Sequence, residues 1–141
     1  MASLAAILLN GDTDLPNVTQ VVTFASAKAG DSAFAKAYNL QVNQTSYEYH
    51  LDIVPFLPPS QATMDAMDEN GTTLMEGVLW NDTATQEANK DYIWDFQPVG
   101  ERRYIDSNIN VLCNVTKELD EQRIKDIERK TLLSLREFAA A

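Results

Sequence analysis

The pattern of apolar and polar positions divides the first third of the chain into a helix and two strands. Residues 1–9 are nearly all apolar and favour a helix, and Gly11 provides a stop just after them. Residues 18–24 are rich in β-branched residues and mostly apolar, which predicts a strand that is buried on both faces. Residues 42–50 have the same β-forming character. The pattern therefore predicts a helix followed by two strands.

Polar residues that commonly cap helices mark two further helices. Asp31 or Ser32 should begin a helix that runs to about Tyr38. After a proline-rich loop, Ser60 should begin another helix that ends near Met67.

The last part of the chain has a helical pattern that begins after Thr116, a plausible N-cap. Its apolar side recurs at helical spacing, at Leu119, Ile124, Ile127, Thr131, Leu135 and Phe138. Residues 91–113 contain strand-like pieces on either side of Pro98. Helices and strands that alternate in this way predict a layered α/β domain.

Composition limits the classes of function to consider. The chain has 141 residues, enough for about one domain, and its net charge of −10 argues against nucleic acid as a partner, since phosphates require a basic surface. No apolar run reaches the roughly 18 residues that span a membrane, so we expect no integral membrane segment. One cysteine, Cys113, and one histidine, His50, exclude an internal disulfide and a metal site of several thiolates or imidazoles. We therefore expect no metal, no cofactor and a buried thiol at Cys113.

Five N-x-(S/T) sequons occur along the chain, at Asn17, Asn43, Asn70, Asn81 and Asn114. They favour a secreted protein over a cytoplasmic one. An acidic bacterial protein rich in asparagine and threonine would show the same pattern, so localisation stays open.

Two segments resemble the class 3, or fungal-type, lipases, which are α/β hydrolases. Residues 21–35 are similar to the family's T-F-G-x-P-R-V-G-(N/D)-x-x-F-A run, with Ala25, Ala27 and Lys28 in place of the usual Gly, Pro and Arg. Residues 52–59, Asp-Ile-Val-Pro-Phe-Leu-Pro-Pro, look like the family's D-I-V-P-x-L-P-P almost letter for letter. The second segment is the specific one.

The resemblance covers roughly residues 1–113 and implies one, incomplete, α/β-hydrolase-like domain over residues 1–141. Three layers with a mostly parallel sheet are expected, together with a long amphipathic helix over residues 116–141. In that family the aspartate of the second motif is the acid of a Ser-His-Asp triad, a role that falls to Asp52. A carboxylate fixed at a strand end can accept the imidazole N–H and stabilise the imidazolium. The alternative is that Asp52 only caps the turn before Pro55.

The other two members of such a triad are missing from the sequence. No G-x-S-x-G turn is present to expose a serine, and no histidine follows His50. By the resemblance, we expect the serine before Met1 and the histidine after Ala141. His50 is too near Asp52 in the chain to serve easily as its base, and we interpret it as a strand-end residue. We therefore predict no ester hydrolysis by this chain alone.

Two hypotheses of function remain open. The chain is either the part of a carboxylic-ester hydrolase that supplies Asp52, with a lipid or ester as substrate, or a non-catalytic α/β-hydrolase-like module that binds or assembles. In both cases an unpaired sheet edge predicts a homodimer. Trp80, Tyr92 and Trp94 could line an acyl pocket, although core packing is the simpler interpretation.

Overall fold

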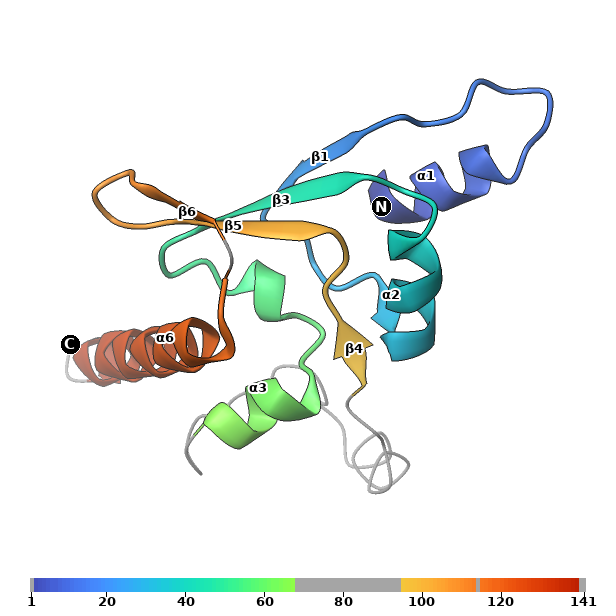
Figure 1. The fold of residues 1–141 in the computed structure, drawn as a ribbon. Coiled ribbons are helices and arrows are strands. Elements are labelled where there is room, and N and C mark those ends of the chain that lie inside the picture. Colours follow the sequence, from blue (N-terminus) through green and yellow to red (C-terminus); the bar gives the residue numbers. More distant parts are fainter. Residues whose placement is uncertain (1, 68–94, 114, 140–141) are drawn as a thin grey trace, which may run out of the picture.

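A computed structural model describes residues 2–67, 95–113 and 115–139 of the chain. A mixed four-stranded sheet forms its centre (Figure 1), in the order β1 (Val21–Phe24), β3 (Gln44–Tyr49), β5 (Glu101–Ile105) and β6 (Val111–Cys113). The first three strands are parallel, and β6 runs antiparallel to β5. A separate antiparallel pair joins β2 (Gly30–Asp31) to β4 (Phe96–Gln97).

The helices of the described part are α1 (Ala2–Asn10), α2 (Ser32–Asn39), the 3-10 helix η1 (Val54–Phe56), α3 (Gln61–Ala66) and α6 (Lys117–Ala139). Helices α2, α3 and α6 lie on the same side of the sheet (Figure 1). The α/β class is thereby confirmed, as is the long C-terminal helix. None of the described helices is long and apolar enough to cross a membrane.

Three helices begin at the capping residues that the sequence predicts. Asp31, Ser60 and Thr116 each accept, through a side-chain oxygen, the backbone N–H of the residue three positions later, at 2.8, 3.2 and 3.3 Å. Each contact satisfies one of the N–H groups that a helix start leaves without a partner. The predicted starts of α2, α3 and α6 are confirmed.

The described part contains two apolar clusters. The larger is built from Ala6, Val21, Ala35, Tyr38, Val42 and Val99. A smaller one joins Phe56 to Ile124 and Ile127, so the predicted apolar side of α6 faces the loop after β3. The side chains of Leu135 and Phe138 lie outside the described residues.

Polar side chains connect the first two helices to the sheet within this core. Ser3 Oγ and Tyr38 Oη both donate to Gln44 Oε1, at 2.9 and 2.7 Å. Gly100 lies close to the backbone of Gln44. Its φ is +76°, and an added Cβ would lie 2.5 Å from the carbonyl oxygen of Gln44. Glycine is the residue that fits such a position.

The prediction that the first strand is buried on both faces is wrong. Val22 is 49% exposed and Phe24 is 74% exposed, while Val21 is buried. Strand β1 is at the edge of the sheet, and α2, α3 and α6 lie on one side of it, so none of these three helices covers the other face. Phe24 stacks instead on Tyr47 of the neighbouring strand, with ring centroids 5.4 Å apart.

Candidate functional site

Asp52 lies just beyond the carboxyl end of β3, the strand that has a parallel neighbour on each side. Its backbone N–H donates to Tyr49 O at 2.8 Å, and its Oδ1 accepts the N–H of Val54 at 2.9 Å. The side chain is half-buried. Among the residues that the structure describes, Oδ2 has no hydrogen-bond partner. One oxygen therefore orients the carboxylate, and within the described residues no donor occupies the other.

His50 is the residue directly after β3, as the sequence predicts, and it has a positive φ of 29°. Its Nδ1 lies 3.4 Å from the hydroxyl oxygen of Tyr104, and its ring meets the Tyr49 ring edge-on at 6.1 Å. Among the contacts of the described residues, none joins the side chain of Asp52 to that of His50. The structure thus does not bring these two side chains together as a base and its orienting acid.

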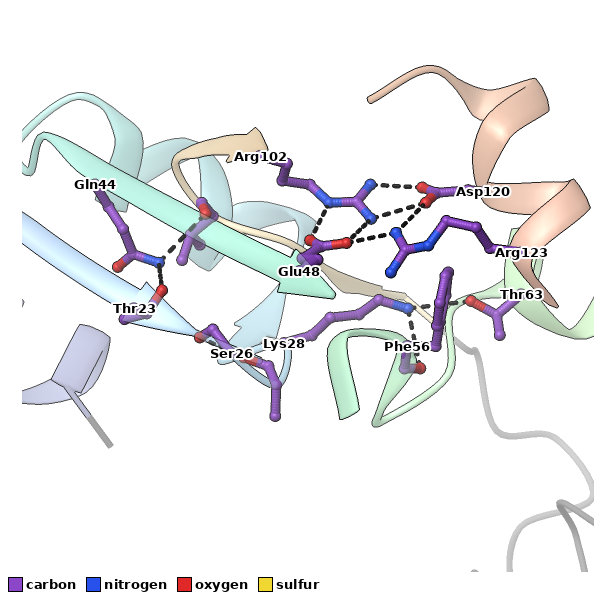
Figure 2. A network of polar contacts seen from close by, with 12 residues as sticks. Thr23, Ser26, Lys28, Gln44, Glu48, Phe56, Thr63, Arg102, Asp120 and Arg123 are labelled. Carbon is purple, nitrogen blue, oxygen red and sulfur yellow. Dashed lines mark hydrogen bonds and ion pairs between the residues drawn. The ribbon is translucent and has the colours of Figure 1, made fainter. Parts of the chain in front are cut away.

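A group of buried ions joins α6 to the sheet next to this loop (Figure 2). Glu48 of β3, 2% exposed, accepts hydrogen bonds from Nε and Nη2 of Arg102 at 2.6 and 2.8 Å and from Nη1 of Arg123 at 2.7 Å. Asp120 of α6 bonds both guanidinium groups as well. These four residues, Glu48, Arg102, Asp120 and Arg123, are called the buried ion cluster below.

The buried ion cluster also holds the loop that follows Asp52. The guanidinium carbon of Arg123 lies 4.8 Å from the ring centroid of Phe56 and 4.7 Å from that of Tyr104. A guanidinium group at this distance is attracted to the face of an aromatic ring. Because Phe56 belongs to η1, the cation–π contact fixes the position of the proline-rich loop on α6.

The cluster shifts the pKa values of Glu48 and Arg102. Burial alone would raise the pKa of Glu48, but the hydrogen bonds and charges of Arg102 and Arg123 outweigh burial and hold this pKa below its usual value. Burial alone would lower the pKa of Arg102. The hydrogen bonds and charges of Glu48 and Asp120 outweigh burial, so the pKa of Arg102 is raised above its usual value. Glu48 and Arg102 are therefore charged at neutral pH.

Lys28, in the loop after β1, is buried close to this cluster (Figure 2). Its Nζ donates to the carbonyl oxygen of Phe56 at 3.3 Å and to Thr63 Oγ1 at 3.1 Å. The Thr63 hydroxyl lies 2.9 Å from Ser60 Oγ. Burial, with the nearby charge of Arg102, lowers the pKa of Lys28 to about 8. The ammonium group is thus bound only to uncharged oxygen atoms within the described part.

A pocket of about 260 Å³ lies between the loop after β3 and the start of α6. Its charged lining in the described part consists of Lys28, Arg102, Lys117, Asp120 and Glu121. Apolar groups, including Phe56 and Ile124, cover much of the remaining wall. Asp52 does not line this pocket.

Comparison with known families supports the resemblance carried by the sequence. Residues 1–62 match the class 3 lipase family. The predicted resemblance is confirmed over these residues, which include Asp52 and its Asp-Ile-Val-Pro segment. No curated protein and no solved structure matches the chain.

The part that matches the class 3 lipases contains α1, the first two parallel strands, α2 and the loop with Asp52. It ends inside α3, so β5 and α6 lie beyond it. Some sequence predictions fall outside the described residues. They are the acyl-pocket candidates Trp80, Tyr92 and Trp94, and the buried thiol expected at Cys113, whose side chain is not described.

Sequence reasoning missed the buried ion cluster. Glu48 and Arg123 are separated by 75 positions, and Glu48 and Arg102 by 54. No local pattern relates residues so far apart. A carboxylate in the middle of the strand predicted over residues 42–50 was the one available signal, since such a residue is almost never fully buried without a partner.

Proposed function

We propose that this chain is part of a carboxylic-ester hydrolase that acts on acylglycerols, and that Asp52 is the acid of its Ser-His-Asp triad. The observation that carries this proposal is the position of Asp52, at the carboxyl end of a central parallel strand and inside the class 3 lipase match. Its carboxylate is oriented by the Val54 N–H through one oxygen. The second oxygen is suited to accept an imidazole N–H and stabilise the imidazolium.

The serine and the histidine of this triad come from residues other than these 141. The sequence has no G-x-S-x-G turn, and its one histidine has Tyr104 and Tyr49, not Asp52, as neighbours. Triad members act as a unit, so the acid alone supplies no nucleophile and no base. We therefore propose that residues 1–113 form the lipase-like part of one domain and residues 116–141 its C-terminal helix, and that the 141 residues alone do not hydrolyse esters.

Turnover of p-nitrophenyl butyrate tests this proposal. The 141-residue chain alone should give no rate above that of the buffer. The protein isolated from its source should hydrolyse the ester and should be labelled by a fluorophosphonate, which reacts with activated serines. A source protein that neither turns over the ester nor takes the label would contradict the proposal, and so would turnover by the 141 residues alone that Asp52→Ala abolishes.

A second candidate function is a non-catalytic module that assembles through the face of its sheet. Exposed Val22 and Phe24 on the edge strand favour it, because parallel sheets are normally covered on both faces. In this case the Asp52 carboxylate serves only as the turn cap for Val54. A homodimer is proposed under either function. A source protein that is dimeric but inactive toward esters would favour the module over the hydrolase.

A further inference from the structure

The described charged residues that line the pocket near α6 are three cations and two acids, and the two acids pair with two of the cations. Arg102 bonds Asp120 at 2.5 Å, and Lys117 lies 3.4 Å from Glu121. Each of these pairs joins one lining cation to one lining acid, so the two acids of the lining are both used. Lys28 is the remaining cation of the described lining.

Lys28 is 8% exposed, and no described carboxylate lies within ion-pair distance of its Nζ. An ammonium group has three protons to donate, and Phe56 O and Thr63 Oγ1 accept two of them. A buried cation is costly unless it is paired. Among the described residues the third donor, on a side chain that lines the pocket, has no acceptor, and no carboxylate is in contact with the ammonium group.

The rest of the pocket limits which anion fits. A dianion such as phosphate is disfavoured, because Asp120 and Glu121 line the same space and only one cation is in excess. The volume of about 260 Å³ is several times the roughly 30 Å³ that a water molecule occupies. Apolar wall formed by Phe56, Pro98 and Ile124 offers room for a hydrocarbon tail.

We propose that this pocket binds a short-chain carboxylate, with its carboxyl group on Lys28 Nζ and its acyl chain along the apolar wall. The Thr63 and Ser60 hydroxyls lie beside the ammonium group, and because one of their two protons is used in the 2.9 Å bond between them, the pair can supply one further donor. This site is separate from Asp52 and does not depend on the proposed ester hydrolysis.

Titration with sodium butyrate tests the site on the 141-residue chain at pH 7. Calorimetry and thermal unfolding should show saturable binding of one butyrate and a rise in Tm that sodium chloride and sodium phosphate at equal ionic strength do not produce. Lys28→Met should weaken butyrate binding at least tenfold. Lys36→Met removes an exposed lysine on α2 and should leave binding unchanged.

A third variant keeps the test valid should Lys28→Met fail to fold. Ala62→Leu adds bulk at an exposed position that lines the pocket and leaves the contacts of Lys28 in place. Ala62→Leu should weaken the binding of butyrate more than the binding of formate, which has no hydrocarbon tail. Equal Tm shifts with butyrate and chloride, tighter binding of phosphate than of butyrate, or full affinity in Lys28→Met would each overturn the proposal.

Discussion

The substitution Glu48→Gln should destabilise the fold more than any exposed charge substitution in the chain. It keeps the shape of the side chain but replaces a carboxylate that accepts three hydrogen bonds of 2.6 to 2.8 Å from two guanidinium groups. The glutamine N–H₂ group points additional donors at Arg102 and Arg123. Breaking a buried ion pair by removing one partner costs roughly 3–5 kcal/mol, because the other charge stays buried. Since Arg123 is only 2% exposed, we expect a loss of about 4 kcal/mol in the free energy of unfolding.

A matched control is available on the neighbouring strand. Glu101 pairs with Arg103 at 3.0 Å, but the two side chains are 49% and 34% exposed. Exposed pairs of this kind contribute about 0–1 kcal/mol, so Glu101→Gln should change the free energy of unfolding by less than about 1 kcal/mol. Urea unfolding followed by far-UV circular dichroism measures both variants.

The pH dependence of the difference identifies the charge as its cause. The pKa of Glu48 is lower in the folded chain than its usual value of 4.5, so its stabilising effect is complete above that value and disappears as the pH falls through the folded pKa. The gap between wild type and Glu48→Gln should be constant from pH 7 to about pH 5.5 and should narrow below about pH 4.5. A loss no larger than that of Glu101→Gln, or a gap that is the same at pH 3 as at pH 7, would refute the reasoning.

Three further substitutions test other parts of the account. Gly100→Ala should lower the free energy of unfolding by at least about 1–2 kcal/mol, because φ is +76° and the new Cβ would approach Gln44; Gly11→Ala, whose Cβ meets only ordinary contacts, should change it little. Phe24→Asp should convert the proposed homodimer to a monomer, as measured by light scattering. Leu40→Asp changes a residue that is even more exposed but lies outside the sheet, and should leave the dimer intact; a dimer that survives Phe24→Asp argues against this face. The lowered pKa of Lys28, about 8, means that its charge opposes folding below that pH and that the penalty fades as the pH rises toward 10.5. Relative to Lys28→Met, wild type should gain about 3 kcal/mol in urea unfolding between pH 7 and pH 10.5, and no gain would show that the ammonium is not desolvated.

Local sequence rules found the elements whose signal is contained in a few neighbouring residues. Asp31, Ser60 and Thr116 begin helices because a side-chain oxygen reaches an N–H only three positions later. The loop with Asp52 was placed correctly after a strand because its motif is contiguous. The apolar spacing of Ile124 and Ile127 likewise predicted which side of the last helix is buried.

Burial of the first strand and the polar contacts around the site were not predictable in this way. An apolar run such as Val-Val-Thr-Phe predicts a strand covered on both faces, but coverage depends on which elements pack there, and Phe24 is 74% exposed. The partners of Glu48 come from a strand and a helix far along the chain. Lys28 stood out in the sequence only as a departure from the lipase motif, and its burial follows from the fold.

The most direct test of the central claim compares two aspartates that each cap a turn, of which Asp106 also accepts hydrogen bonds from the backbone and side-chain N–H groups of Asn110. Asp52 accepts the N–H of Val54, and Asp106 accepts the N–H of Asn108, both at the second residue after the aspartate. In the ester-hydrolysing protein isolated from its source, or produced with its full sequence, Asp52→Asn should lower kcat for p-nitrophenyl butyrate by about 10⁴-fold, the effect expected for loss of a triad acid. Asp106→Asn should leave kcat within about twofold of wild type. Equal activities in the two variants would contradict the account and leave Asp52 as a turn cap alone.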